Sequence, residues 1–255
     1  MAFRMTYRIQ KGIYKEKCDD SALLGTYIAN NEAGEMIAEG PLKICVGDGV
    51  GGNAGSDEAS LFVMDRAANI PEQISCEDLI DSLREINRAL IAHAGKIQGH
   101  ETMATTLTGL FLTKKQALLA HCGNTRLYAA QGSFLKQITE DQTISQWLIN
   151  TGNAAAAEVC NKNEIRGAFG GGNEKFIEPL EVSHVFERGL PAKILMTSDG
   201  VHEYLSADEM EDILRGNSSR DAAEIMIQKA VAAGSEDDCT VIIVDTISGS
   251  IIQND

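Results

Sequence analysis

Aromatic residues and positive charge are both scarce in this sequence of 255 residues. Aromatic side chains make up 5% of the chain and hydrophobic residues 44%, so Val, Ile, Leu and Ala must build most of the core. The 22 Lys and Arg residues are outnumbered by 37 Asp and Glu residues, which gives a formal net charge of -15. An acidic chain without a Lys/Arg cluster is repelled by a phosphate backbone, so we expect no nucleic-acid partner.

Membrane, secretion and linker signals are also missing. No apolar stretch approaches the roughly 18 residues of a membrane-spanning helix, and the N-terminal residues have no apolar signal-peptide core. None of the six cysteines forms a C-x-x-C pair, which is typical of free thiols in a reducing cytoplasm. Because no Pro/Gly/Ser-rich linker divides the chain, we expect a single domain over residues 1–255.

The order of strand and helix signals predicts an α+β fold. The expected strands cover residues 6–10, 21–29, 42–46, 105–113, 117–122, 126–130, 134–138, 192–197 and 240–245. The expected helices are one after Gly55 that Ser56 can cap, one over 76–94, one from Ser206 with a Glu209 capping box, and one over 219–233. Residues 139–175 are expected to be irregular. Because strands and helices do not alternate, two antiparallel sheets with helix pairs outside fit better than a doubly wound parallel sheet.

Acidic residues recur where predicted strands begin or end. The strand LKICV leads into Asp48, KILMT leads into Asp199, and CTVIIV follows Asp237. A fourth acidic pair, Asp19 and Asp20, precedes the strand SALLGTYIA. Carboxylates brought together repel each other unless a cation lies between them, and oxygen ligands favour Mg2+, Mn2+ or Ca2+. Two such ions about 3.5–4 Å apart can ionise a bridging water that attacks phosphorus. Each Asp-Gly pair is also compatible with a simple turn.

The segment GDGVGG (47–52) also matches the G-x-G-x-x-G pattern of dinucleotide-binding proteins. We reject this interpretation because Asp48 would face a pyrophosphate of like charge. The helix after the segment is moreover followed by another helix, so the required β-α-β continuation is missing.

Six segments in order resemble the protein phosphatase 2C (PPM) family along nearly the whole chain. They are GIYKEKCDD (12–20), GDGVGG with EAS (47–52 and 58–60), MATTL (103–107), HCGNTRLYAAQGSFLKQITEDQT (121–143), ILMTSDGVHEYLS (194–206) and SEDDCT (235–240). The first resembles the G-x-x-R-x-x-N-E-D opening of the family, and the second resembles the GDGMGG segment of bacterial members. The resemblance implies a four-layer αββα sandwich of two antiparallel sheets flanked by helix pairs.

The same resemblance implies a centre of two Mn2+ or Mg2+ ions, with a third site weak or absent. By matching position, Asp48 bridges both ions, Gly49 supplies a carbonyl, and Asp199 and Asp237 complete one ion. Asp19 and Asp20 serve the second ion and its waters. Lys15 falls where the family has a phosphate-binding Arg, and residues 139–175 form a flap beside the site. The implied catalytic residues are therefore Lys15, Asp48, Asp199 and Asp237.

The chain departs from the family motifs at several positions. These are Lys15 for Arg, Cys18 for Asn, Asp19 for Glu, Asn124 for Asp, Gln142 for His, Asp238 for Asn, and Val50 where many eukaryotic members have His. The core ligands are intact. The resemblance implies metal-dependent hydrolysis of phosphoserine and phosphothreonine in proteins by a cytoplasmic monomer that opposes a serine/threonine kinase. The alternative is a catalytically weak member that binds phosphoproteins as a sensor or scaffold.

Overall fold

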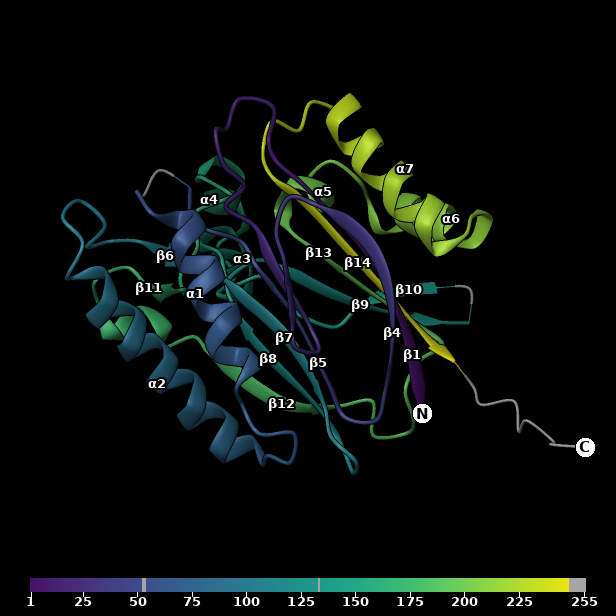
Figure 1. Ribbon diagram of the computed structural model, residues 1–255. Coiled ribbons are helices and arrows are strands. Elements are labelled where there is room, and N and C mark those ends of the chain that lie inside the picture. Colours follow the sequence, from purple (N-terminus) through teal and green to yellow (C-terminus); the bar gives the residue numbers. More distant parts are fainter. Residues whose placement is uncertain (52–53, 133, 248–255) are drawn as a thin grey trace, which may run out of the picture.

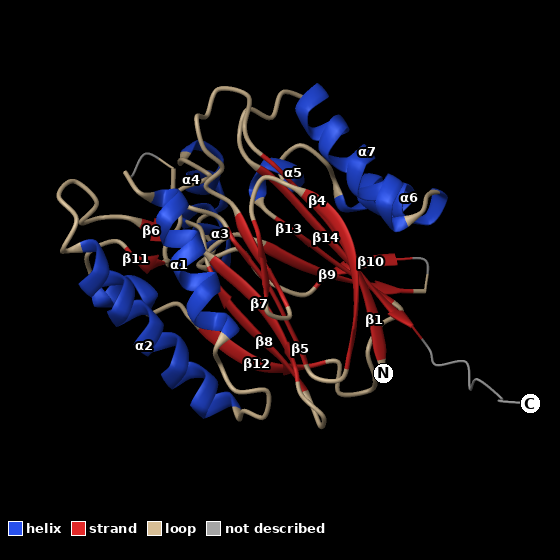
Figure 2. Ribbon diagram, in the orientation of Figure 1, coloured by secondary structure: helices blue, strands red, loops and turns tan. Residues whose placement is uncertain are grey.

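The structure, a computed structural model, describes residues 1–51, 54–132 and 134–247. Two six-stranded sheets pack face to face, and a pair of helices covers the outer face of each sheet (Figure 1). Every strand pairing in the two sheets is antiparallel. Figure 2 shows the two layers of strands between the helices. The predicted α+β class and the four-layer sandwich of antiparallel sheets are therefore confirmed.

The first sheet has the strand order β10-β9-β13-β14-β1-β4. Its strands are β1 (Ala2–Gln10), β4 (Ala33–Glu39), β9 (Arg126–Gln131), β10 (Phe134–Gln137), β13 (Lys193–Thr197) and β14 (Cys239–Ile247). The first and last long strands, β1 and β14, pair along their whole length, from Ala2 opposite Ile247 to Gln10 opposite Cys239. The two ends of the described chain therefore meet in the middle of one sheet.

The second sheet has the order β12-β8-β7-β5-β2-β3. Its strands are β2 (Ser21–Leu24), β3 (Tyr27–Ala29), β5 (Leu42–Gly47), β7 (Leu107–Leu112), β8 (Ala117–Cys122) and β12 (Glu181–Val185). A small two-stranded ladder joins β6 (Ala104–Thr105) to β11 (Phe169–Gly170). The helices are α1 (Ser56–Ala68), α2 (Cys76–Ala94), α3 (Ile144–Asn150), α4 (Ala154–Val159), α5 (Asp199–His202), α6 (Ala207–Gly216), α7 (Ser219–Ala232) and the 3-10 turn η1 (Glu174–Ile177).

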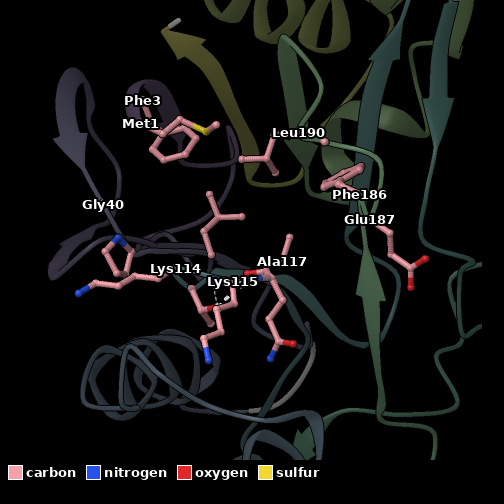
Figure 3. Close-up of a pocket in the computed structure, with 14 residues that line it drawn as sticks. Met1, Phe3, Gly40, Lys114, Lys115, Ala117, Phe186, Glu187 and Leu190 are labelled. Carbon is pink, nitrogen blue, oxygen red and sulfur yellow. Dashed lines mark hydrogen bonds between the residues drawn. The ribbon is translucent and has the colours of Figure 1, made fainter. Parts of the chain in front are cut away.

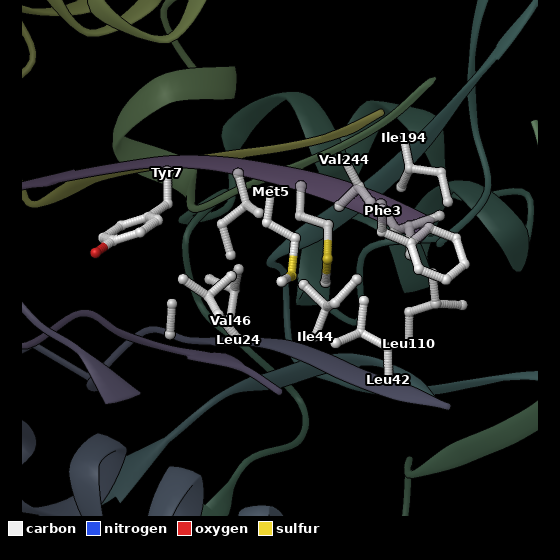
Figure 4. Packing of buried hydrophobic residues seen from close by; sticks show 14 of the residues in the cluster. Phe3, Met5, Tyr7, Leu24, Leu42, Ile44, Val46, Leu110, Ile194 and Val244 are labelled. Carbon is white, nitrogen blue, oxygen red and sulfur yellow. The ribbon is translucent and has the colours of Figure 1, made fainter. Parts of the chain in front are cut away.

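The central core lies between the two sheets (Figure 4). Alternate residues of β1 point into it, and Phe3, Met5 and Tyr7 face Leu42 and Ile44 of the opposite sheet. This alternation follows from the pleat of a strand, which sends successive side chains to opposite faces. Each such buried side chain contributes roughly 1.5–3 kcal/mol. The packing fixes the relative position of the sheets and therefore of the loops at their ends.

The helices confirm the signals read from the sequence, with one exception. The predicted stripe of α2 is buried throughout, at Leu79, Leu83, Ile86, Leu90 and Ala94. The capping box of Ser206 and Glu209 begins α6. Among the helices of the described residues, none combines the length and apolar content that crossing a bilayer requires.

The exception is the start of α1, where the predicted Ser56 cap is wrong. The cap residue is Gly55, whose φ of 83° lies in the left-handed region that glycine tolerates. Ser56 instead donates its hydroxyl hydrogen to the carbonyl of Val50. This bond holds the loop after Asp48 against the helix.

Three other expectations need correction. The expected strand over 21–29 is a hairpin, because the chain turns at Gly25, whose φ is 70°. The edge strands β4 and β12 were missed; neither has a fully buried residue, so neither forms a marked apolar run in the sequence. Residues 139–175 are not irregular, since they contain α3, α4, β11 and the start of η1.

Candidate metal centre

In the second sheet, two paired strands place Asp20 and Asp48 beside each other. Asp48 directly follows β5, and Asp20 directly precedes β2. Ser21 of β2 is the register partner of Gly47 of β5, so the two aspartates leave the sheet at the same end. Strand ends are rigid mounts, and the positions of both carboxylates are therefore fixed.

In the first sheet, β13 and β14 bring Asp199 and Asp237 to the same end of the sandwich. Asp199 follows β13 and begins α5, whereas Asp237 lies just before β14, and these strands are paired. A hydrogen bond of 2.6 Å from the Thr240 hydroxyl to Asp20 Oδ2 connects the two sheets at this point. The structure thus brings together aspartates from four segments that are far apart in the sequence.

Two glycines of the motifs allow the acidic loops to approach each other. A Cβ atom on Gly200 would lie 2.1 Å from the carbonyl oxygen of Asp238. A Cβ atom on Gly49 would lie 2.6 Å from the carbonyl oxygen of Ser56 and 2.9 Å from the Cβ of Asp19. Any other residue would push these loops apart. The glycines are therefore needed for convergence of the carboxylates, beyond any role as turn residues.

Asp48 and Asp199 are acidic groups whose charged forms are disfavoured by burial and by neighbouring carboxylates. Burial raises the pKa of Asp48 well above its usual value, and the neighbouring carboxylates of Asp199, Asp20 and Asp237 raise it further. Burial and the charge of Asp237 also raise the pKa of Asp199. The negative charges of the cluster therefore disfavour the ionised form of both carboxyls. A divalent cation between them would remove the repulsion.

Asp20 is a buried carboxyl with an unused oxygen. Its side chain is 1% exposed, and within the described residues Oδ1 has no hydrogen-bond partner. Burial, followed by the charge of Asp238, raises the pKa of Asp20 to about 8. An unpaired buried oxygen is costly, and a ligand or ion-bound water would satisfy it. The residues of the centre therefore suit a group of positive charge.

Lys15 lies among the carboxylates. Its Nζ is 2.5 Å from Asp237 Oδ1, 2.9 Å from Asp238 Oδ2 and 3.1 Å from Asp19 Oδ2. Burial lowers the pKa of the ammonium, but the hydrogen bonds to Asp237 and Asp238 outweigh it, and the net pKa is raised. Lys15 is therefore a permanent positive charge inside the centre.

Metal coordination is not preformed in this arrangement. Within residues 1–51, 54–132 and 134–247, no three His, Cys, Asp or Glu side chains are placed to hold a metal ion as they stand. Two of the predicted ligands, Asp19 and Asp237, instead contact the ammonium of Lys15. The donors still suit a hard divalent cation, since all of them are oxygens. The assignment of Asp19, Asp20, Asp48, Gly49, Asp199 and Asp237 as ligands stays a prediction.

Asp238 was not among the predicted site residues, although the structure places it in the centre. The side chain is 1% exposed and accepts hydrogen bonds from the backbone N–H groups of Gly12 and Asp19. The sequence signal was its departure from the Asn of the family motif. The significance of that departure depends on the contact with Lys15, which the sequence does not reveal.

The predicted flap is fixed to the end of the sandwich through Gln142. Its side-chain Oε1 accepts from the N–H of Gly123 at 3.0 Å, and its Nε2 donates to the carbonyl of Pro179 at 2.8 Å. Gln142 thus serves as a structural clamp where the family motif has His.

Farther along the flap, Arg166 lies over the ring of Trp147 at 5.2 Å. Trp147 is half-exposed, so it packs on the flap surface and not in a core.

The cavity in Figure 3 lies at the other end of the sandwich, with a volume of about 460 Å3. Met1 and Phe3, at the start of β1, contribute to its lining together with Lys114 and Lys115 from the turn between β7 and β8. Asp48 and its neighbours lie beyond the opposite strand ends. The cavity is therefore separate from the acidic centre.

Comparisons with known proteins agree with this description. No protein-family model matches the chain. The serine/threonine phosphatase Stp of Listeria welshimeri is 28% identical over 218 residues, which cover 79% of this chain and 83% of that protein. The crystal structure of the Mycobacterium tuberculosis serine/threonine phosphatase PstP/Ppp superposes with a TM-score of 0.78 at 24% identity, covering 97% of this chain and 100% of that one.

A second crystal structure of PstP, its catalytic domain in complex with two manganese ions, has a TM-score of 0.75 and 23% identity, again covering 97% of this chain and 100% of that one. At this level of identity the structural likeness shows the fold. The chain therefore shares the sandwich of these bacterial phosphatases over 97% of its length.

Proposed function

We propose that this chain, whose relatives and fold confirm its resemblance to the protein phosphatase 2C family, hydrolyses phosphoserine and phosphothreonine in proteins. The observation that carries the proposal is the convergence of Asp20, Asp48, Asp199 and Asp237 at one end of the sandwich, with raised pKa values for the first three. Such a cluster is unfavourable without added positive charge, and perturbed carboxyls of this kind are typical of functional sites.

The residues have distinct roles in this proposal. Asp48, the Gly49 carbonyl, Asp199 and Asp237 would hold two divalent ions, while Asp19 and Asp20 would serve the second ion and its waters. When bound, the ions supply a bridging water as nucleophile and positive charge against the phosphoryl oxygens. Lys15, the one cationic side chain in contact with the predicted ligands among the described residues, would bind the phosphate. No covalent intermediate is needed.

Two Mn2+ or Mg2+ ions per chain fit the donor set. The oxygen ligands suit both ions, and the PstP structure that contains two manganese ions supports the stoichiometry. We expect a third ion to be absent or weakly held, because Asn124 directs an amide N–H toward Asp199. An N–H group repels a cation.

The substrate would be a phosphorylated protein, since the relatives carry the names of protein serine/threonine phosphatases. We extend the proposal, from the family resemblance, to a cytoplasmic monomer that opposes a serine/threonine kinase. The alternative of a catalytically weak sensor or scaffold gains no support from these relatives.

An assay of the purified chain tests the proposal directly. With p-nitrophenyl phosphate and matched phosphoserine, phosphothreonine and phosphotyrosine peptides, we expect turnover only with added Mn2+ or Mg2+. Excess EDTA should abolish turnover, and the peptides carrying phosphoserine or phosphothreonine should be preferred. Full activity in excess EDTA would contradict the two-ion mechanism, and no turnover with Mn2+ would favour the sensor.

A further inference from the structure

Three carboxylates surround the ammonium of Lys15. The Nζ atom donates hydrogen bonds to Asp19 and Asp238 and forms an ion pair with Asp237 at 2.5 Å. A phosphate oxygen must therefore compete with three carboxylates for one ammonium group. The proposed role of Lys15 in phosphate binding requires that at least one of these three contacts be released.

The three carboxylates that contact the ammonium differ in burial and in the number of hydrogen bonds that fix them. Asp238 is 1% exposed and is fixed by N–H donors from Gly12 at 2.8 Å and Asp19 at 2.7 Å. The side chain of Asp237 is 50% exposed, and its carboxylate contacts within the described residues are the backbone N–H of Asp238 and the ion pair with Lys15. Asp238 is thus the fixed partner of Lys15, and Asp237 is the partner that can turn away.

The pairing of Lys15 with Asp238 is also required by charge. A buried carboxylate without a cation is strongly destabilising. Among the described residues, Lys15 is the cationic side chain that pairs with Asp238. The two positions are separated by 223 residues, and both depart from the motif that the rest of the segment follows. The charge of Asp238, where the family motif has Asn, is therefore compensated by Lys15, where the motif has Arg.

We propose that Asp238 is a positioning residue that holds the Lys15 ammonium beside the predicted ion ligands, where it takes the place of a divalent cation until one binds. With Asp237 coordinating a cation, its ion pair with Lys15 would be lost. The ammonium would then be able to donate to a phosphate oxygen while Asp238 still holds it. This inference rests on the proposed function, because it assumes that Asp237 is an ion ligand.

Calorimetric titration of the chelator-treated full chain with Mn2+ tests the competition without any measurement of activity. Lys15→Met removes the competing ammonium, and we expect the Kd for Mn2+ to fall on the order of 10-fold. Lys17→Met is the matched control, because Lys17 lies two residues away and pairs with Asp57, at 2.7 Å, outside the carboxylate cluster. Its Kd should stay within about 2-fold of the unmodified chain. An unchanged Kd in Lys15→Met would overturn the proposal.

Loss of Lys15 leaves Asp238 unpaired, so Lys15→Met alone can destabilise the fold. The comparison of Asp238→Asn with Lys15→Met/Asp238→Asn avoids this problem, because neither variant contains the unpaired buried carboxylate. Removing the ammonium should again lower the Kd for Mn2+. Equal affinities in these two variants would contradict the competition.

A double-mutant cycle at saturating Mn2+ tests the positioning role. If Asp238 acts through Lys15, Asp238→Asn should raise the KM for p-nitrophenyl phosphate roughly 3-fold or more in the Lys15 background. It should change KM by less than about 2-fold in the Lys15→Met background. Equal effects in both backgrounds would show that Asp238 does not act through Lys15. Absence of turnover in the unmodified chain would instead refute the proposed function, and the titrations would still decide the competition.

Discussion

Asn124 donates a hydrogen bond from its side-chain amide to Oδ2 of Asp199, over a distance of 2.8 Å. The Asn124 side chain is 4% exposed, and this bond lowers the pKa of Asp199 while burial raises it. Asn124 is therefore more than a residue of the turn between β8 and β9. Its amide N–H dipole offsets part of the negative charge of the Asp199 carboxylate. The family motif has Asp at this position.

The first prediction is that Asn124→Asp creates or strengthens a third ion site. The substitution replaces an N–H donor with a second carboxylate beside Asp199, which favours a divalent cation. Calorimetry should show an additional Mn2+-binding event, and the Mn2+ concentration for half-maximal turnover should fall. Asn173→Asp makes the same charge change on the surface, where Asn173 caps η1, and should alter neither quantity. Unchanged stoichiometry and activation in Asn124→Asp would exclude a latent third site.

The second prediction concerns Asp48→Asn. Loss of the charge that both ions share should lower the rate on the order of 100-fold or more. The same substitution should raise the Tm of the metal-free protein by roughly 2–4 °C, because a neutral amide replaces a carboxyl whose charge burial and the neighbouring carboxylates disfavour. Rate assays with Mn2+ and thermal unfolding in EDTA measure the two effects.

Asp65→Asn is the control for this prediction. Asp65 lies on α1 with a 67% exposed side chain, and its one ion pair, to Arg66, spans 3.8 Å. Such an exposed pair contributes little. Both rate and Tm should therefore be nearly unchanged. Near-normal turnover and metal affinity in Asp48→Asn would remove Asp48 from the site.

The third prediction concerns the phosphate. Lys15→Ala, assayed at saturating Mn2+, should raise KM for a phosphopeptide, because the cationic side chain that we place at the phosphate is lost. Lys15→Arg should preserve or lower KM, since a guanidinium offers phosphate a planar pair of donors. An unchanged KM in the Ala variant would show that Lys15 does not contact the phosphate.

The fourth prediction is a dependence of stability on pH that comes from His202. Its ring is buried, with Nδ1 2.8 Å from the Thr197 hydroxyl, and burial lowers its pKa well below the usual value. The unfolded chain therefore takes up a proton below about pH 6.5 that the folded chain does not, and stability falls as the pH decreases. In EDTA, this residue should lower Tm by roughly 2–4 °C between pH 7.5 and 5.5.

His202→Gln should show a smaller decrease in Tm over this pH range than the unmodified chain. His184→Gln serves as the control, because His184 is exposed on β12. The decrease in Tm of His184→Gln over this pH range should match that of the unmodified chain. Identical slopes for His202→Gln and the unmodified chain would mean that His202 has the same pKa in the folded and the unfolded chain, which would contradict the prediction.

The sequence by itself determined the features that depend on local pattern. The apolar stripe from Leu79 to Ala94 has helical spacing, and it is buried as predicted. Ser206 and Glu209 form the capping box that their spacing indicated. The motif segments that contain Asp48, Asp199 and Asp237 could be recognised in order, and the class of fold followed from them. Each of these inferences needs only residues that are close together in the chain.

Only the tertiary structure decided which strands pair and which side chains are in contact. The edge strands β4 and β12 exist because neighbouring strands offer them partners, and Gly34 of β4 is needed because a Cβ there would lie 2.5 Å from the Tyr7 hydroxyl oxygen. Asp237 and Asp238 look equivalent in the sequence, yet one is half exposed and the other is 1% exposed beside Lys15. Burial and charge pairing depend on packing between segments separated by 223 residues, and no local pattern encodes that distance.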